Sequence, residues 1–551
     1  MIKRLAVWFV LVSIGGPTGA LATTLTIGTS QFPSTLHPNL QLSVAKSYIQ
    51  QMTMRPITAF DPEWELACFL CTDLPTLENG GAVAVDLDDG TKGVQITYSL
   101  HPDAVWGDGT PVSTDDVLLT WEIGRHPKIG IANQELYRDI TDIDVIDQKT
   151  FRLHVRELDF RYNAINDFRL IPAHLEREIF EQDPERYAER TTFDSDPTHP
   201  GLAFGPYRIT EIETGAYVVL EINPTWWAEP PAFERIIIKT IENTSALASN
   251  LVSGDVDMIA GELGLPLDQA ISFEAQYGED YNFQYEPGLI YEHLDLNLDN
   301  PILADRRVRQ ALIQGVDRAA LSTQLFDGRQ PVAHTSVHPL DWVYTDDVPV
   351  YERNVDEAIA LLEQAGWKLG ADGIRRNDAG DSLSLTLMTT AGNQTRERVQ
   401  QFLQSQWKEI GVEIRIQNQP PRVFFGETVS RRKFSGMALF AWISSPENPP
   451  RSTLHSEEIP TDENGFAGQN YTGYSNPEMD ELLDAIELEL DPEARKQLWH
   501  EIQRIYATDL PAIPLYFRAN AHIWPHWLEG VTPTGHQNSS SLYVENWRRI
   551  N

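Results

Sequence analysis

The chain has 551 residues, and its 41% apolar and 22% charged residues are typical of a globular protein. This length leaves room for roughly two to four domains. The 80 acidic residues against 43 basic ones give a formal net charge of −37. Such a surface argues against nucleic acid or an anionic membrane as a partner, because both are bound through basic surfaces. We attribute the acidic excess to solubility, since net charge alone does not establish a cationic ligand.

The amino terminus has the pattern of an export signal. Lys3 and Arg4 precede an apolar run over 5–14, and a small-x-small triplet ends at Ala22. This pattern predicts a secretory signal peptide over 1–22, cleaved after Ala22. The apolar run is shorter than the roughly 20 residues that span a bilayer. The residue directly after the cleavage point is Thr23 rather than a cysteine, so we expect a periplasmic protein that is not a lipoprotein. The alternative is a buried helix at the amino terminus.

The only two cysteines, Cys68 and Cys71, are spaced C-x-x-C. In an oxidising compartment this spacing favours a local disulfide. Free thiols and a redox pair are the alternatives, although a redox pair usually opens a helix and Pro75 here indicates a turn. A zinc site would need two further ligands, and no paired Cys or His supplies them.

Strand and helix patterns alternate along the whole chain. Alternating apolar residues predict strands over 24–29, 93–100, 150–156, 217–222, 235–241, 383–388 and 412–416. Helical spacing, with cap residues before and glycines after, predicts helices over 117–123, 305–326, 355–365, 395–410, 477–490 and 492–507. Strands that alternate with helices predict an α/β fold, in which ligands bind at sheet switch points or between lobes.

The sequence contains no linear catalytic motif. A P-loop, a dinucleotide fingerprint, a G-x-S-x-G elbow and an H-E-x-x-H pair are all missing. The pair His334 and His338 lies across a loop, and Pro525 interrupts the pair His522 and His526, so surface histidines are favoured over a metal site. We therefore predict a non-enzymatic protein without metal or cofactor. An exported hydrolase that uses carboxylates in a cleft is the remote alternative.

One long block and several short ones carry a family resemblance. The block over 96–117 contains His-Pro-Asp-Ala-Val-Trp-Gly-Asp-Gly-Thr-Pro and predicts a strand, a turn and a capped helix. Shorter blocks follow in order at 204–209, 223–227, 251–257, 296–297, 305–312, 316–318, 361–367 and 410–412. In this order they resemble the large periplasmic solute-binding proteins of peptide and nickel ABC importers, the dipeptide- and oligopeptide-binding protein family.

The resemblance implies a type II periplasmic binding protein-like α/β fold with two ligand-enclosing lobes and an extra inserted lobe. The expected boundaries are 23–56, 196–285 and 511–551 for lobe I, 57–195 for lobe II and 286–510 for lobe III. Lobes I and III would close on the ligand by a hinge, and the closed monomer would meet the permease subunits of an ABC transporter.

The resemblance also implies ligand contacts in lobe III. Peptide-binding members have a Trp followed, three residues on, by an Asp that pairs with the free amino terminus of the peptide. Here Trp442 matches, although a core position is its alternative, and Ser445 stands where the Asp is expected. A buried ammonium needs a carboxylate, so we expect either that Glu447 substitutes or that the ligand lacks a free amine.

Further contacts follow by position in the family: Asn393, Phe32, His37, Tyr48 and Arg55. Asn393 has a plain helix cap as its alternative, and Arg55 could meet either a ligand carboxylate or an acidic surface. Tyr471 and Tyr474 are weaker candidates. We predict a peptide ligand, with an oligosaccharide, an opine-like compound or a metal chelate as alternatives.

Overall fold

The computed structural model describes residues 23–40, 43–87, 90–131, 133–420, 423–464, 466 and 468–550. The predicted signal peptide over 1–22 lies outside these residues. No helix within the described ranges combines the length and the apolar character needed to cross a membrane.

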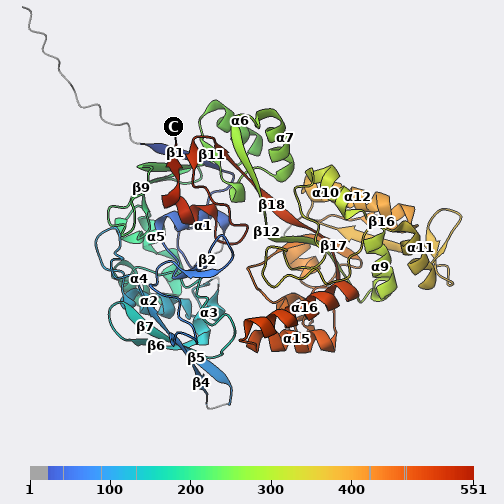
Figure 1. Ribbon diagram of the computed structural model, residues 1–551, viewed down its shortest axis with the longest axis horizontal. Helices are drawn as coiled ribbons and strands as arrows, with labels where there is room; N and C mark the ends of the chain where they lie inside the picture. The colour runs from blue at the N-terminus through green and yellow to red at the C-terminus, as the bar shows by residue number, and fades with distance from the viewer. Residues whose placement is uncertain are drawn as a thin grey trace, which may run out of the picture.

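A ten-stranded mixed sheet runs through the molecule in the order β16-β15-β17-β12-β18-β11-β1-β10-β9-β8 (Figure 1). The strands are β1 (Thr24–Thr29), β8 (Tyr207–Glu213), β9 (Tyr217–Ile222), β10 (Arg235–Thr240), β11 (Met258–Ile259), β12 (Tyr281–Leu296), β15 (Ser384–Met388), β16 (Glu413–Ile416), β17 (Met437–Ile443) and β18 (Ala512–Pro525). We call β11, β1, β10, β9 and β8 the β1 half of the sheet, and β16, β15 and β17 the β15 half.

Two long antiparallel strands, β12 and β18, join the two halves, as Figure 1 shows at the centre of the molecule. Their pairing shifts register between Pro287 and Tyr291. Side chains alternate between the faces of a strand. Beyond the shift, Leu294 and Leu296 therefore enter the apolar core of the β15 half, and His293 lies on the opposite face.

Helices cover the faces of the sheet. They are α1 (Val44–Thr53), α6 (Thr244–Ser253) and α7 (Leu267–Tyr277) around the β1 half, and α9 (Arg306–Gln314), α10 (Arg318–Phe326), α11 (Val355–Gln364), α12 (Gln394–Glu409), α15 (Pro477–Leu488) and α16 (Pro492–Asp509) around the β15 half. Short helices α5 (Thr192–Ser195), α8 (Pro301–Ala304) and α14 (Arg451–Leu454) lie in connections.

The single helix predicted over 305–326 is wrong, because the chain forms two helices there. The first, α9, ends at Gln314, and Asp317 caps the second by accepting a hydrogen bond from the Ala320 N–H at 2.7 Å. Gly315 and a capping aspartate inside an apolar pattern are signals for a boundary that the helical periodicity concealed.

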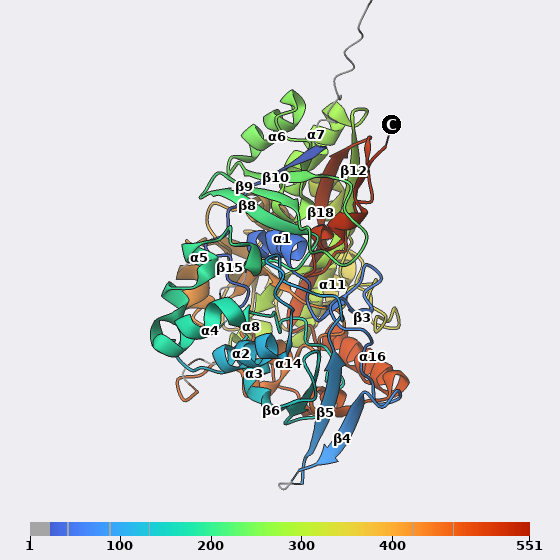
Figure 2. The same ribbon diagram turned by 90° about the vertical axis from the view of Figure 1, so that its left-hand side faces the viewer.

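A separate antiparallel sheet, β4-β5-β7-β6, forms one end of the molecule (Figure 2). It contains β4 (Ala82–Asp86), β5 (Lys92–Ser99), β6 (Ile140–Val145) and β7 (Thr150–Val155), with α2 (Thr114–Gly124), α3 (Gln134–Asp139) and α4 (Ala173–Gln182). The small hairpin of β2 (Thr58–Phe60) and β3 (Leu66–Cys68) leads into it. The structure joins Cys68 to Cys71 in a disulfide just after this hairpin. The remaining pairs are β13 (Lys368–Leu369) with β14 (Arg375–Arg376), and β19 (Leu528–Glu529) with β20 (Arg548–Arg549).

The carboxylate of Asp116 organises the block over 96–117. It accepts hydrogen bonds from the Trp106 indole at 3.1 Å, the Ser113 N–H at 2.8 Å and the Ala173 N–H at 2.7 Å. Asp116 is 2% exposed. One buried side chain thus caps α2, fixes the Trp106 ring and anchors the start of α4.

Replacing Asp116 by Ala leaves these donors without a partner. We expect the variant to lose about 3 kcal/mol of free energy of unfolding in urea denaturation. The control is Asp115→Ala on the exposed side of the same helical turn, which we expect to lose less than about 1 kcal/mol. Equal losses in the two variants would contradict the assigned role of Asp116.

Candidate ligand-binding cavity

A cavity of about 170 Å³ lies beside the β12–β17 ladder. Its lining residues all fall between Leu289 and Ala512. They come from β12, from β17 and the loop after it, from the loop over 336–341, from the segment around α14, from the loop over 469–472, from α16 and from the start of β18. The cavity therefore belongs to the part of the chain that surrounds the β15 half.

The β12 wall presents Tyr291, His293 and Asp295, the three residues on one face of the strand. All three are at least nine-tenths buried. The Tyr291 hydroxyl meets the Tyr506 hydroxyl at 2.7 Å. His293 Nε2 lies 3.1 Å from Asp295 Oδ1. Alternation thus places an aromatic ring, an imidazole and a carboxylate in a row along the wall.

Trp442 stands opposite Tyr291 in the ladder and lines the same cavity. Its ring stacks on that of Tyr471, with centroids 5.7 Å apart and planes at 27°. It also lies nearly parallel to the His293 ring, at 6.5 Å and 15°. The indole is half-buried, with one part packed in the core and the rest available to the cavity.

Ser445 also lines the cavity, whereas Glu447 is not among the lining residues. The Glu447 carboxylate forms an ion pair with the buried Arg495 and accepts a hydrogen bond from the Trp342 indole at 3.1 Å. Its charge is thus already matched by a guanidinium, so the structure does not present Glu447 as the substitute carboxylate.

Two residues of the loop over 336–341 complete the cavity wall. His338 accepts the Leu340 N–H on Nδ1 at 3.0 Å, and burial lowers its pKa to about 4. Asp341 accepts the Glu447 N–H at 2.8 Å. His338 is therefore neutral at pH 7, and Asp341 adds a carboxylate next to the segment that contains Ser445.

The remaining predicted contacts lie elsewhere. Asn393 caps α12 by accepting the Arg396 N–H at 3.0 Å, which matches its alternative interpretation. Phe32 and the buried Tyr48 pack in the core of the β1 half. None of these three side chains lines the cavity.

His37 and Arg55 also serve the packing around α1. His37 accepts the N–H groups of Asn39 and Leu40 on Nδ1, and its Nε2 lies 3.1 Å from the Tyr187 hydroxyl. Burial, with the charge of Lys46, lowers the pKa of His37 to about 3. Arg55 is 4% exposed and pairs with Glu545 at 2.6 Å. The acidic partner of Arg55 is therefore internal to the protein.

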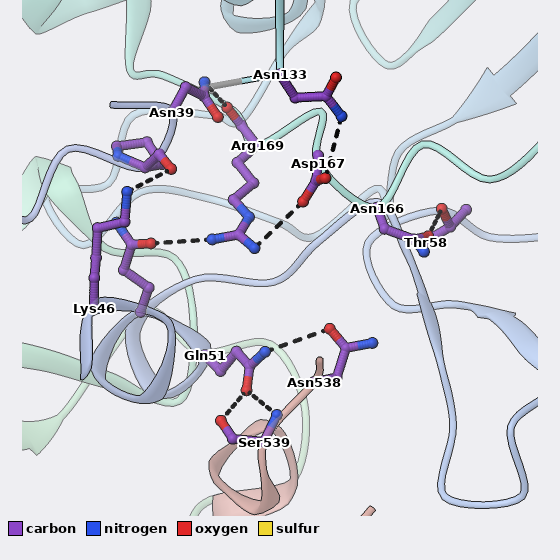
Figure 3. A network of polar contacts seen from close by, with 12 residues as sticks. Asn39, Lys46, Gln51, Thr58, Asn133, Asn166, Asp167, Arg169, Asn538 and Ser539 are labelled. Carbon is purple, nitrogen blue, oxygen red and sulfur yellow. Dashed lines mark hydrogen bonds and ion pairs between the residues drawn. The ribbon is translucent and has the colours of Figure 1, made fainter. Parts of the chain in front are cut away.

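A polar network next to α1 fastens three distant segments together (Figure 3). Arg169 donates to Gln50 at 3.3 Å, and its carbonyl accepts from Asn39 at 2.9 Å. Gln51 in turn accepts the Ser539 N–H at 2.9 Å. The network joins α1, the loop that leads to α4 and the carboxyl-terminal segment, so the β1 half and the four-stranded sheet are held as neighbours.

Behind the cavity, on the other face of β12, Glu292 forms a buried ion triad. Its carboxylate is 2.5 Å from Arg396 Nε and 2.6 Å from an Arg518 guanidinium nitrogen. Burial acts to raise the pKa of Glu292, but the charges of Arg518 and Arg396 outweigh it and hold the pKa below its ordinary value. The triad ties β12 to β18 and to the first turn of α12.

Sequence reasoning missed Asp295, His293 and Asp341, and it wrongly favoured a surface position for His338, which is 2% exposed. A signal existed for the first two, because the segment over 291–295 reads Tyr-Glu-His-Leu-Asp inside an otherwise apolar strand pattern. Three ionisable groups on one buried strand indicate partners or a ligand. Among the described residues, no cluster of three or more His, Cys, Asp or Glu could hold a metal ion.

A profile of the family described as "Bacterial extracellular solute-binding proteins, family 5 Middle" matches residues 81–457. The chain belongs to this family. The resemblance inferred from the sequence blocks is thereby confirmed, and so is the α/β fold of the periplasmic binding proteins.

The similarity to individual family 5 proteins covers nearly the whole chain. The oligopeptide-binding protein AppA of Bacillus subtilis is 26% identical over 536 residues, which is 95% of this chain and 91% of that protein. The oligopeptide-binding protein of Thermus thermophilus, solved with a pentapeptide, is 29% identical, with a TM-score of 0.73 over 95% of this chain and 96% of that one. NikA from Brucella suis, solved with Fe(III)-EDTA, is 18% identical, with a TM-score of 0.77 over 96% of this chain and 100% of that one.

Replacing Glu292 by Ala removes the carboxylate partner of the buried Arg396 and of Arg518, whose side chain is 34% exposed. We expect a loss of about 3–5 kcal/mol in the free energy of unfolding at pH 7, measured by urea denaturation. The control Glu409→Ala removes an exposed partner of Arg353 on the same helix, α12, and we expect it to lose less than about 1 kcal/mol.

The pH dependence provides a second measurement of the Glu292 triad. Because the folded-state pKa of Glu292 is depressed, its stabilisation is complete above the unfolded-state pKa and is lost as the pH falls through the folded-state pKa. The difference in stability between wild type and Glu292→Ala should therefore shrink in acid. A constant difference from pH 7 down to pH 3 would contradict this assignment.

Proposed function

We propose that this family 5 protein captures a peptide outside the cytoplasmic membrane and delivers it to the permease subunits of an ABC transporter. The observation that carries the proposal is the cavity, in which Trp442, Tyr291 and the half-buried Ser445 offer aromatic surface beside polar groups. Such a lining suits a chain of amide groups with varied side chains. The end-to-end similarity to two oligopeptide-binding proteins supports the same ligand class.

Lobes I and III would close on the ligand by a hinge at β12 and β18. This hinge is consistent with the boundaries 23–56, 196–285 and 511–551 for lobe I, 57–195 for lobe II and 286–510 for lobe III. Both strands pass between the halves of the sheet, and their pairing is irregular from Pro287 to Tyr291. One contact supports a closing motion: the Trp64 ring, in the expected lobe II, lies 5.4 Å from the ring of His338, in the expected lobe III. The Trp64 indole is itself anchored to the expected lobe I, because it donates to the Thr534 carbonyl at 2.7 Å.

The proposal includes a monomeric, non-enzymatic periplasmic protein whose signal peptide is cleaved after Ala22. The family description, which names extracellular solute-binding proteins, supports an extracytoplasmic location. The acidic composition, with a formal net charge of −37, supports a function without nucleic acid.

A metal chelate is the second candidate ligand. It is favoured by Ser445, which supplies no carboxylate at the predicted amine position. The fold is shared with NikA of Brucella suis, whose structure contains Fe(III)-EDTA. Oligosaccharides and opine-like compounds are the other alternative ligands, and the following experiment includes them.

Thermal unfolding of residues 23–551 with separate ligand pools tests the proposal. A ligand that binds only the folded protein stabilises it by about 2.7 kcal/mol at 100 times its dissociation constant. We expect di- to hexapeptides to raise the Tm, and oligosaccharides, opines and nickel or iron chelates to leave it unchanged. A shift with chelates and none with peptides would overturn the peptide assignment.

The Trp442→Ala variant locates the binding site. We expect its affinity for the stabilising peptide to fall at least about tenfold, because a stacked aromatic contact worth more than about 1 kcal/mol is lost. Trp527→Ala, in the core of the β1 half, is the control for general destabilisation. Isothermal titration calorimetry measures both, and equal affinities for Trp442→Ala and wild type would place the peptide elsewhere.

A further inference from the structure

The charged groups of the cavity are acidic. Asp295 and Asp341 line it, and among the described residues neither a Lys nor an Arg does. Burial keeps His338 neutral, and its Nδ1 already accepts the Leu340 N–H. A cavity with this inventory favours a ligand that brings positive charge, because the carboxylates are removed from water without an equal number of cations.

The two carboxylates differ in their partners. Asp295 already has the imidazole of His293 at 3.1 Å. Asp341 receives only backbone groups, the Glu447 N–H at 2.8 Å, the Val343 N–H at 3.4 Å and the Trp342 N–H. Within the described residues no Lys, Arg or His forms an ion pair with Asp341, although it is only 7% exposed. Asp341 is therefore the lining carboxylate that has no cationic partner among the residues that the structure describes.

The electrostatic surroundings of Asp341 point the same way. Burial raises the pKa of Asp341 to about 6, and the nearby Glu447 carboxylate adds to the effect. The guanidinium of Arg495, which lies beside Glu447, is already engaged by that carboxylate. A ligand cation would thus relieve a cost that the protein itself leaves uncompensated.

Asp341 also lies close to Ser445, the position at which the family resemblance leads us to expect an Asp. Its carboxylate is bonded to the backbone of Glu447, two residues after Ser445, and both Asp341 and Ser445 line the cavity. Position 445 has no carboxylate. Asp341, in a loop about a hundred residues earlier in the chain, places one on the same wall of the cavity.

We propose that Asp341 binds a protonated amino group of the ligand. The proposal rests on the peptide function given above and narrows it, because it selects peptides with a free amino terminus and disfavours blocked peptides, neutral sugars and anionic chelates. The ammonium would donate to the Asp341 carboxylate, in a charge-assisted hydrogen bond shielded from water.

The test compares matched peptide pairs. A peptide that stabilises the wild type is synthesised with a free and with an N-acetylated amino terminus, and both affinities are measured by isothermal titration calorimetry at pH 7.5. We expect the wild type to bind the free form at least about tenfold more tightly. This comparison needs no variant, so a folding defect in Asp341→Asn would not prevent it.

The same pair is then measured with Asp341→Asn and with the control Asp346→Asn, an exposed acidic residue of the same segment. We expect Asp341→Asn to lose the preference for the free amine while its affinity for the acetylated peptide stays within about twofold of the wild type. The Asp346→Asn variant should keep the preference.

The possible outcomes separate the two proposals. If the wild type binds free and acetylated peptides equally, the peptide function stands and the amine site at Asp341 is overturned. The amine site is also overturned if Asp341→Asn keeps the full preference. If neither form of any peptide binds, the peptide function fails, and the narrower proposal fails with it.

Discussion

The antiparallel pairing of β12 with β18 is the constraint on which the rest of the structure depends. These two strands join the β1 half to the β15 half, so their register fixes how the halves meet. Alternation along β12 then assigns each residue a face. His293 and Asp295 enter the cavity, while Glu292 turns to the buried side and holds Arg396 and Arg518. A slip of one residue would exchange the two sets.

The buried carboxylates in and around the cavity differ in their partners. Glu292 has two guanidinium partners, and Glu447, in the segment after Ser445, has Arg495. Asp341 has no cationic partner among the described residues, although it is as deeply buried as many paired residues. Because an unpaired charge in the interior is destabilising, the exception at Asp341 supports the proposal that the ligand brings the missing cation. We assign a structural role to a buried carboxylate that is paired with a cation of the protein, and a ligand-binding role to one that is not.

Local patterns in the sequence predicted many of the strands and helices, whereas the type II fold was inferred from the family resemblance. The strands predicted over 24–29 and 217–222 coincide with β1 and β9, because apolar alternation is a local property. The ordered blocks were sufficient for the family. The helix predicted over 305–326 was wrong, since apolar periodicity continued through the cap at Asp317. Trp442 and Ser445 were expected to be candidates near one another, and both line the cavity.

The rest of the site depends on contacts between distant segments. Asp341 meets the Glu447 backbone across about a hundred residues, and Arg55 finds Glu545 near the other end of the chain. No local pattern predicts which carboxylate receives which cation, so Glu447 was a reasonable candidate until Arg495 was located beside it. His37 and Tyr48 are aromatic groups near a predicted cleft, but packing around α1 buries them away from the cavity.

The origin of the cavity lining has a consequence for the order of events during transport. All of its residues lie between Leu289 and Ala512, whereas the contacts from Trp64 reach it from the opposite side of the gap. In the proposed closing motion, the ligand would therefore meet this lining before the opposite side reaches it. The rate of encounter would depend on the lining alone, and the residence time would depend on how long the opposite side stays in contact. An importer that opened the protein at the membrane would shorten the residence time without changing the lining that first bound the ligand.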